Sequence, residues 1–299
     1  MKKYIGQRSI AFENPPCILS EASIAGQKEF EGPLGGYFDK IEKDPMCGGN
    51  SWEEAESLLQ QKAASLAIEK AGLVPEDIRY LVAGDLLGQL IATSFGVVSL
   101  NIPMFGVYGA CSTMGESMSI ASILVDGGYA DRVIALTSSH FAGAEKQFRF
   151  PLAYGNQRPL SATWTVTGSG AVVLSAHQEG KKNWLGIRGI TTGKVTDFGI
   201  KDSMNMGACM APAAYDVIYN HLSDLGLQPD YYDKIITGDL GMVGKEILLD
   251  MMKERGLDIS NNIWIAGLKY MTLKHRIPIL GEVAVDAVRL HLLVISLSK

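Results

Sequence analysis

Cys111 lies between a strand-like apolar run, Phe105–Tyr108, and a helix-like segment of small residues, Ser117–Leu124, with a Gly-Ala turn directly before it. At the start of a helix, unpaired N–H groups and the helix dipole favour an anion. A thiolate at Cys111 could therefore act as a nucleophile. Alternatively, the same N–H groups, with the hydroxyls of Ser112 and Thr113, could hold a carboxylate of a ligand. Cysteine is also among the most often buried residues, so an inert thiol packed behind the turn is the competing interpretation.

Length, composition and charge narrow the class of protein. The 299 residues, 47% of them hydrophobic and 20% charged, suit one large α/β domain or two fused halves. The net charge of -5 and the lack of a long Lys/Arg run predict no nucleic-acid partner. The N-terminus lacks the apolar core of a signal peptide, and no apolar run is long enough for a membrane-spanning helix. The four cysteines have no paired spacing, so neither a disulfide framework nor a metal site is expected, and no cofactor.

A sequence pattern occurs twice in the chain. Gly72–Leu86 recurs as Gly226–Leu240, with Gly, Leu, Pro, Gly, Asp and Leu at the same spacing. Each copy follows a helical stretch, at 51–71 and roughly 211–225, and contains a glycine helix end, a Pro-marked turn and a short apolar strand. A further helix follows each copy. The repeat predicts two similar α/β halves, stacked about a pseudo-two-fold axis.

Other segments complete this plan. Arg132–Ser138 and Gly168–Ser175 have the apolar character of strands. Between them, residues 139–161 form a polar segment too long for a simple connector, and long loops of this kind are usually functional or disordered. The linker between the two halves is expected within 181–202.

Six short stretches carry a resemblance to a known family. Together with the tandem halves and the cysteine at a strand-to-helix turn, they make the chain similar to the thiolase and ketoacyl synthase superfamily. More closely, the chain resembles the stage V sporulation protein AD family of spore-forming bacteria. The stretches are Phe12-Glu13-Asn14-Pro15-Pro16, Gly84-Asp85-Leu86-Leu87-Gly88-Gln89, Gly109-Ala110-Cys111-Ser112-Thr113-Met114, Ser138-Ser139-His140-Phe141, Arg149-Phe150-Pro151 and Tyr154-Gly155-Asn156-Gln157-Arg158-Pro159.

The resemblance implies a thiolase-like α/β fold of two similar halves in a layered α-β-α-β-α arrangement, with the second half incomplete. It also implies a role in the uptake of dipicolinic acid into the developing spore. The protein would be made in the forespore cytoplasm and bind dipicolinic acid, alone or as its calcium chelate. It would lie peripherally on the spore inner membrane, beside other stage V sporulation membrane proteins of the same operon. A homodimer is a further expectation.

The C-terminal segment departs from the family near Trp264. The family should finish with a Gly-rich strand, Thr-His-Ser-Gly-Gly-Ser-Gly-Cys-Gly-Cys-Ser-Ala, which this chain lacks. Codons for 264–295 can be chosen so that a shifted reading frame spells much of that strand, which suggests a frame change; a divergent C-terminus is the alternative. The tail should then not supply the last strands of the fold. The expected parts are an N-terminal half at 1–180, a partial C-terminal half at 181–263 and an aberrant tail at 264–299.

Acyl transfer of the thiolase type needs a nucleophilic cysteine, an acid or base, and donors for an oxyanion. Cys111 supplies the first. Where ketoacyl synthases offer a catalytic His in the second half, this chain has Asp239, and a carboxylate would repel an oxyanion. The His of the final Gly-rich strand is also absent. Catalysis is therefore disfavoured: an acyltransferase using Cys111 is the alternative to a binding protein, and a purely structural scaffold is a third interpretation.

Dipicolinate is a flat aromatic dianion, so its pocket needs cationic or N–H donors, hydroxyls and an apolar slot. The pocket is expected at the inner end of the Cys111 helix, facing the second half. His140, just past a strand end, and Arg149, in the long loop, could reach a carboxylate of the ligand. Alternatively, His140 could be a surface loop residue, and Arg149 could belong to a surface ion pair. Asp85 and Gln89 could shape the pocket or bond a loop. The candidate ligand-binding residues are Cys111, Ser112, Thr113, His140, Arg149, Asp85 and Gln89.

Overall fold

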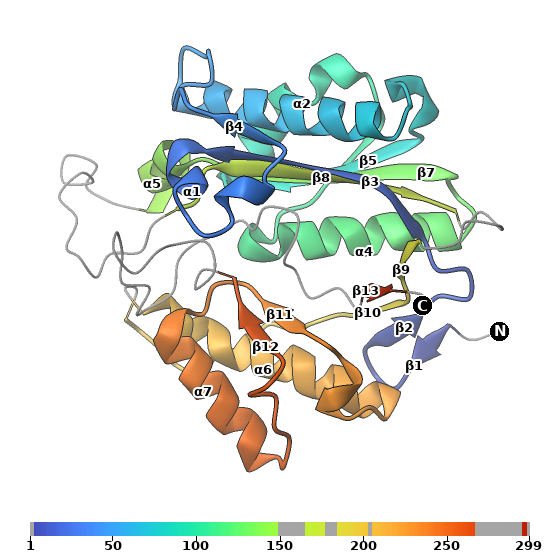
Figure 1. Cartoon of the computed structure of the whole chain (residues 1–299), viewed down its shortest axis with the longest axis vertical. Helices are drawn as coiled ribbons and strands as arrows, with labels where there is room; N and C mark the ends of the chain where they lie inside the picture. Colours follow the sequence, from blue (N-terminus) through green and yellow to red (C-terminus); the bar gives the residue numbers. More distant parts are fainter. Residues whose placement is uncertain (1–2, 149–164, 177–183, 203–204, 267–294, 298–299) are drawn as a thin grey trace.

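The structure, a computed structural model, describes residues 3–148, 165–176, 184–202, 205–266 and 295–297. Its elements form layers (Figure 1): α2 covers one face of an eight-stranded sheet, α4 covers the other, and a small sheet with α6 and α7 lies beyond α4. The helices are α1 (Gln27–Phe30), α2 (Trp52–Lys70), α3 (Ile91–Gly96), α4 (Thr113–Asp126), α5 (Phe141–Phe148), α6 (Met206–Leu225) and α7 (Gly241–Glu254). This layering confirms the expected α/β class with alternating layers of helices and sheets.

The described strands form three sheets. The large sheet has the order β13-β9-β3-β8-β7-β5-β6, with β4 beside β3. Strands β1, β2 and β10 form a second sheet, and β11 pairs with β12. The strands are β1 (Tyr4–Ile5), β2 (Ser9–Ala11), β3 (Cys17–Gly26), β4 (Lys40–Glu42), β5 (Tyr80–Asp85), β6 (Met104–Gly106), β7 (Arg132–Ser139), β8 (Gly168–Ser175), β9 (Leu185–Ile187), β10 (Gly189–Thr191), β11 (Ile235–Thr237), β12 (Ile263–Ile265) and β13 (Ile295–Leu297). The strands predicted at 132–138 and 168–175 are confirmed.

Helix α2 shows how local sequence sets the ends of an element. The Ser51 side chain caps its start by accepting a hydrogen bond from the Glu54 N–H at 3.1 Å. The chain leaves the helix at Gly72, whose φ of 70° is left-handed and suits glycine. The residues that α2 buries are mostly small or apolar, and this lets the helix lie close on the sheet. The helix predicted at 51–71 is confirmed.

The candidate site lies at one edge of the large sheet. Strands β6, β5 and β7 are neighbours and parallel, so their carboxyl ends meet at that edge. Alternate residues of β5 and β7 pack into two different cores, one under α2 and one under α4. A side chain's place in this alternation therefore decides which helix it meets.

The predicted repeat is confirmed element by element. We call residues 52–96 the first unit and 206–254 the second unit. α2 and α6 both end at a glycine with positive φ, Gly72 and Gly226, and a 3₁₀ turn that begins at proline follows each. β5 and β11 come next, and each runs into a turn closed by an aspartate. Asp85 accepts a hydrogen bond from the Leu87 N–H, and Asp239 accepts one from the Gly241 N–H, both at 2.8 Å.

The structure differs from expectation in two connecting segments and at the start of one helix. The linker predicted within 181–202 contains β9 and β10, because its apolar residues pair with β3 and β2. Residues 139–161 do not begin as a loop: α5 starts at Phe141, and 149–164 lie outside the described residues. α6 starts at Met206, earlier than predicted, because Asn205 caps it by accepting the Ala208 N–H at 3.1 Å.

The expected boundary at Trp264 falls inside a strand. β12 includes Trp264 and pairs in parallel with β11, and residues 295–297 pair with β9. At these positions the expectation that the tail supplies no strand is wrong. Residues 267–294 lie outside the described part, so the frame change and the division at 180 and 263 stay predictions. No helix within the described ranges is long and apolar enough to cross a membrane.

Candidate functional site

The predicted order of strand, turn and helix around Cys111 is confirmed. β6 ends at Gly106, a 3₁₀ turn spans Ala110–Ser112, and α4 follows directly. Ala110 has a φ of 49°, a left-handed conformation that costs a residue with a Cβ about 1–2 kcal/mol. Cys111 is half-buried and forms no disulfide. A strained turn therefore presents this thiol at the start of a helix, as is common at functional sites.

Thr113 holds the turn together from inside. Its hydroxyl donates to the Ala110 carbonyl at 2.8 Å and accepts from the Gly109 N–H at 3.3 Å, and the residue is fully buried. A side chain at Gly84 would come within 2.0 Å of the Val107 carbonyl oxygen and 2.6 Å of Thr113 Cγ2. Thr113 therefore supports the turn, and its hydroxyl is engaged there.

Ser112 is exposed and bonds a carboxylate that we did not predict. Its hydroxyl lies 2.9 Å from the Gly109 carbonyl and 2.7 Å from Glu116 Oε1, both acceptors. Glu116 lies in the first turn of α4, where a carboxylate interacts favourably with the positive helix end. The i, i+4 spacing of Ser112 and Glu116 at a helix start was the signal in the sequence. Because of Glu116, the helix start already has an anion beside Cys111.

Asp85 bonds the loop that follows β5, one of the two roles considered for it. Its side chain is fully buried, and Oδ2 accepts from the Thr93 N–H at 2.7 Å and the Thr93 hydroxyl at 2.5 Å. Burial raises the pKa of Asp85, although these hydrogen bonds act in the opposite direction. The carboxylate thus fixes α3 and the loop before it.

Glu56 and Gln60, one turn apart on α2, extend Asp85 into a buried polar cluster. Ser138 Oγ donates to Glu56 Oε1 at 2.8 Å, and Gln60 Nε2 donates to Ser138 Oγ at 2.8 Å and to Thr93 Oγ1 at 3.0 Å. Burial, and then the charge of Asp85, raise the pKa of Glu56 to about 8, so this carboxyl holds a proton at neutral pH. Sequence reasoning missed both residues. Their i, i+4 spacing on a face of small residues was the available signal.

His140 is fully buried rather than part of a surface loop. Its Nε2 lies 2.8 Å from the Pro45 carbonyl oxygen, and Nδ1 accepts from the Ala142 N–H at 3.2 Å. Because Nδ1 accepts, the proton lies on Nε2 and is donated to Pro45. The ring also stacks on Trp52, with centroids 5.5 Å apart. These contacts hold the imidazole in one orientation.

The predicted site residues belong to two faces of the sheet. Asp85 lies beside Glu56, and His140 beside Trp52, and both partners belong to α2. Cys111 instead leads into α4, on the opposite face (Figure 1). The structure thus keeps Cys111, Ser112 and Thr113 together at the start of α4. The side chains of Asp85 and His140 point towards α2 instead.

Gln89 lies in a strained loop near the carboxyl end of β5. Arg149 lies outside the described residues. Gln89 and Leu90 both have positive φ, 67° and 54°, and Gln89 is exposed. A Cβ on Gly106 would come within 2.7 Å of the Leu90 side chain, so this loop packs over β6. Ligand contacts by the candidate residues stay predictions.

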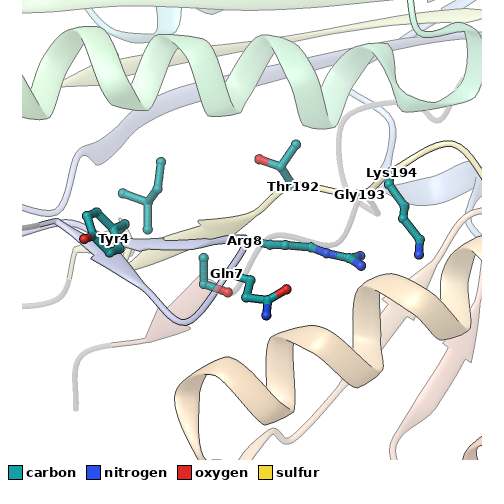
Figure 2. Close-up of a pocket in the computed structure, with 8 residues that line it drawn as sticks. Tyr4, Gln7, Arg8, Thr192, Gly193 and Lys194 are labelled. Carbon is teal, nitrogen blue, oxygen red and sulfur yellow. The ribbon is translucent and has the colours of Figure 1, made fainter.

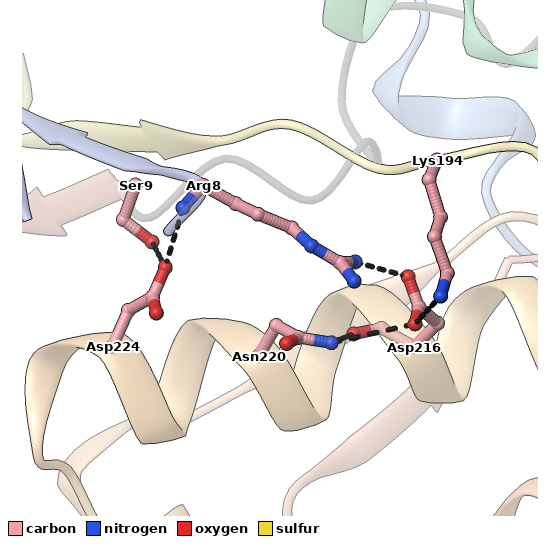
Figure 3. A network of polar contacts seen from close by, with 6 residues as sticks. All are labelled: Arg8, Ser9, Lys194, Asp216, Asn220 and Asp224. Atoms are coloured by element: carbon pink, nitrogen blue, oxygen red, sulfur yellow. Dashed lines mark hydrogen bonds and ion pairs between the residues drawn. The ribbon is translucent and has the colours of Figure 1, made fainter. Parts of the chain in front are cut away.

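A hollow of about 410 Å³ lies among the described residues at a different place (Figure 2). None of the predicted site residues lines it. The two cationic side chains that line it, Arg8 and Lys194, both form ion pairs with Asp216 (Figure 3). Lys194 Nζ lies 3.7 Å from Asp216 Oδ1. A pocket at the inner end of the Cys111 helix stays a prediction. The hollow is lined by Tyr4, Gln7, Arg8, Ser9, Ile10, Thr192, Gly193 and Lys194.

Comparison with known proteins agrees with this architecture. A family model described as Stage V sporulation protein AD (SpoVAD) matches residues 6–276. Stage V sporulation protein AD of Bacillus subtilis is 45% identical over 270 residues, which are 90% of this chain and 79% of that protein. Beta-ketoacyl-(acyl-carrier-protein) synthase III of Sulfurovum sp. is 24% identical over 205 residues, 66% of this chain and 56% of that protein.

Among solved structures, 3-oxoacyl-(acyl carrier protein) synthase III of Xanthomonas oryzae pv. oryzae superimposes with a TM-score of 0.59 at 17% identity. The superposition covers 91% of this chain and 88% of that one. The family match reaches residue 276, so the resemblance extends past Ile263, where we expected it to end. A match over most of the chain, with 45% identity to a curated member, shows that the chain belongs to the stage V sporulation protein AD family.

Proposed function

We propose that this sporulation-family protein binds dipicolinic acid and supports its uptake into the developing spore. The observation that carries the proposal is the turn at Cys111. Its half-buried thiol and the exposed Ser112 hydroxyl lie at the N-terminus of a helix of 14 residues, with Ala110 strained before them. Helix N-termini favour carboxylates, and dipicolinate has two.

Glu116 favours the calcium chelate as the bound form. Its carboxylate already occupies the start of α4 through Ser112, so a free dianion would meet a like charge there. Calcium dipicolinate is neutral, and calcium prefers oxygen ligands such as carboxylates. Binding should therefore be stronger with calcium present, and Glu116→Gln should reduce that difference.

Binding is favoured over catalysis because of the second unit. The resemblance to ketoacyl synthases puts a catalytic His, a proton donor, at the position of Asp239, and a carboxylate there disfavours catalysis. Asp239 is 1% exposed, and its Oδ1 accepts the Gly241 N–H. The alternative, an acyltransferase using Cys111, is favoured by the fold shared with synthases and by the strained Ala110. Incubation with acyl-CoA, followed by mass spectrometry, should find Cys111 unmodified. Stoichiometric acylation there would establish the alternative.

Titration calorimetry with dipicolinate, with and without calcium, tests binding directly. Ser112→Ala and Cys111→Ala should weaken binding by about tenfold, the size of one lost hydrogen bond to a charged group. Cys209→Ala is the matched control, because Cys209 is an exposed cysteine on α6. Absence of binding, or equal loss in the control, would contradict the proposal.

We place the protein peripherally on the spore inner membrane, beside stage V sporulation membrane proteins of its operon. Membership of a sporulation family supports this location. Fractionation of forespores should recover the protein with membranes, and high salt should release it if its attachment is electrostatic. Equal recovery in membranes from cells lacking those partners would contradict the partnership.

The edge strand β6 supports a homodimer. Among the strands that the structure describes, β6 is the last of the large sheet, and its three residues are exposed. Two copies could pair antiparallel here and bury the neighbouring apolar side chains. Light scattering should show a dimer that Phe105→Glu converts to a monomer, whereas Tyr129→Glu, at another exposed aromatic residue, should not. The exposed apolar residues around the edge are Ile91, Phe95, Val98, Met104, Phe105 and Tyr108.

A further inference from the structure

A line of hydrogen bonds joins the N-terminal hairpin to the second unit, outside the candidate site. Ser9 Oγ donates to Asp224 Oδ2 at 2.9 Å (Figure 3) and lies 2.8 Å from Thr191 Oγ1. Thr191 Oγ1 lies 2.7 Å from His221 Nδ1, and His221 Nε2 lies 2.7 Å from the Tyr232 hydroxyl. The line thus connects β2, β10, α6 and the turn before β11.

The carboxylate at one end sets the direction of every bond. Asp224 can only accept, so the Ser9 hydroxyl donates to it and must accept from Thr191. The Thr191 proton is then used, so Thr191 accepts from His221 Nδ1–H. A neutral His221 has no proton on Nε2, which therefore accepts from the Tyr232 hydroxyl.

We propose that this line is a proton-sensitive latch, which holds the N-terminal hairpin on α6 while His221 is neutral and loosens when His221 gains a proton. The second proton would occupy Nε2, where the Tyr232 hydroxyl already donates. Tyr232 would have to turn its proton away. His221 is 5% exposed, so the new cation would also be buried.

Among the residues that the structure describes, few charged groups face His221 to stabilise such a cation. α6 packs chiefly on α7, β10 and β2, and neither β10 nor β2 contains a titratable residue. The buried residues of α7 are uncharged. Asp224 attracts the imidazolium only through space, and the Arg8 guanidinium is paired with Asp216. Burial lowers the pKa of His221, as these surroundings require.

The hairpin turn is built to sit on this carboxylate. Asp224 accepts from the N–H groups of Gln7 at 3.1 Å and Arg8 at 3.0 Å. Gly6 has a φ of 58°, and a Cβ there would come within 2.0 Å of Asp224 Oδ1, so glycine is required. The amides of Gln7 and Arg8 therefore report whether the latch is closed.

Hydrogen exchange of the full chain at about pH 7.5 and about pH 5 tests the latch. After correction for intrinsic rates, protection of the Gln7 and Arg8 amides should fall about tenfold or more at the lower pH. His221→Gln, which does not titrate, should change less than about twofold. Amides of β5 and β7 provide the internal control and should stay protected at both pH values.

Two further measurements decide the outcome if His221→Gln does not fold. Nitrogen NMR of His221 should find the proton on Nδ1 at neutral pH. Thr191→Val cuts the line beside His221 and should leave the hairpin amides weakly protected at both pH values. An Nε2–H tautomer, or hairpin protection that is the same at both pH values in the wild type, would overturn the latch.

Discussion

The two units follow one backbone plan but differ in the side chains that their helices place near the aspartate of each turn. Both have a helix ended by glycine, a Pro-marked turn and a short strand, and the turns of Asp85 and Asp239 close with the same 2.8 Å bond. In the register that aligns these aspartates, the first unit has Glu56, Gln60 and Thr93 where the second has Met210, Ala214 and Ile247. One set is a buried polar cluster, and the other packs on an apolar core.

This difference shows which part of the repeat is specialised. An apolar set is enough to support the turn, as the second unit demonstrates. Burying Glu56, Gln60 and Thr93 costs desolvation free energy, so an apolar set would stabilise the end of the strand at a lower cost in free energy. Its bonds reach Ser138 at the end of β7 and Asp85 at the end of β5. We infer that the cluster positions the carboxyl ends from which Asp85 and His140 extend.

The largest effect should come from Gly84, the residue before Asp85. Gly84→Ala places a Cβ 2.0 Å from the Val107 carbonyl oxygen, so β5 or the Cys111 turn must move. We expect a loss of about 3–5 kcal/mol in the free energy of unfolding, measured by urea denaturation. Gly36→Ala, where a Cβ meets nothing within 4 Å, should change stability by less than about 0.5 kcal/mol. Equal losses in both variants would show that the first unit needs no close approach here.

Replacing the whole polar cluster by its apolar counterpart should cost less stability than the three single replacements cost when added together. Gln60→Ala leaves the hydroxyls of Ser138 and Thr93 without their donor and should cost about 2–4 kcal/mol. Combining it with Glu56→Met and Thr93→Ile, the residues of the second unit, should cost less than the sum of the three single changes. Urea denaturation of all four variants measures this coupling. Simple additivity would mean that the three residues act independently.

The pH dependence of stability should separate the units further. The pKa of Glu56 is raised to about 8, so the folded chain keeps a proton that the unfolded chain loses above about pH 4.5. This contribution is full below that pH and is lost as the pH rises to about 8. Glu56→Gln should therefore gain about 1–3 kcal/mol relative to wild type between about pH 5 and about pH 8.5. A pH-independent difference would mean that Glu56 is ionised throughout.

Sequence reasoning predicted the local features well because their causes are local. Gly72 and Gly226 end helices, and the Gly-Ala-Cys turn joins β6 to α4, in both cases through conformations set by a few adjacent residues. The division of the candidate site could have been derived from strand alternation, which places Asp85 and His140 on the α2 side. The polar cluster could not, because it depends on how α2 is rotated over the sheet. Glu116 was missed since the argument from the helix dipole ignored charges within the helix itself.

Hydrogen exchange with and without calcium dipicolinate compares the Cys111 turn with the Asp239 turn of the second unit, and it tests the binding proposal most directly. Dipicolinate should slow exchange of the amides at 109–116, at the start of α4, by about tenfold at saturating ligand. Residues 238–244, the Asp239 turn of the second unit, should change by less than about twofold, since Asp239 already occupies the Gly241 N–H. Unchanged exchange at 109–116 despite measurable binding, or protection confined to the second unit, would contradict a dipicolinate site at Cys111.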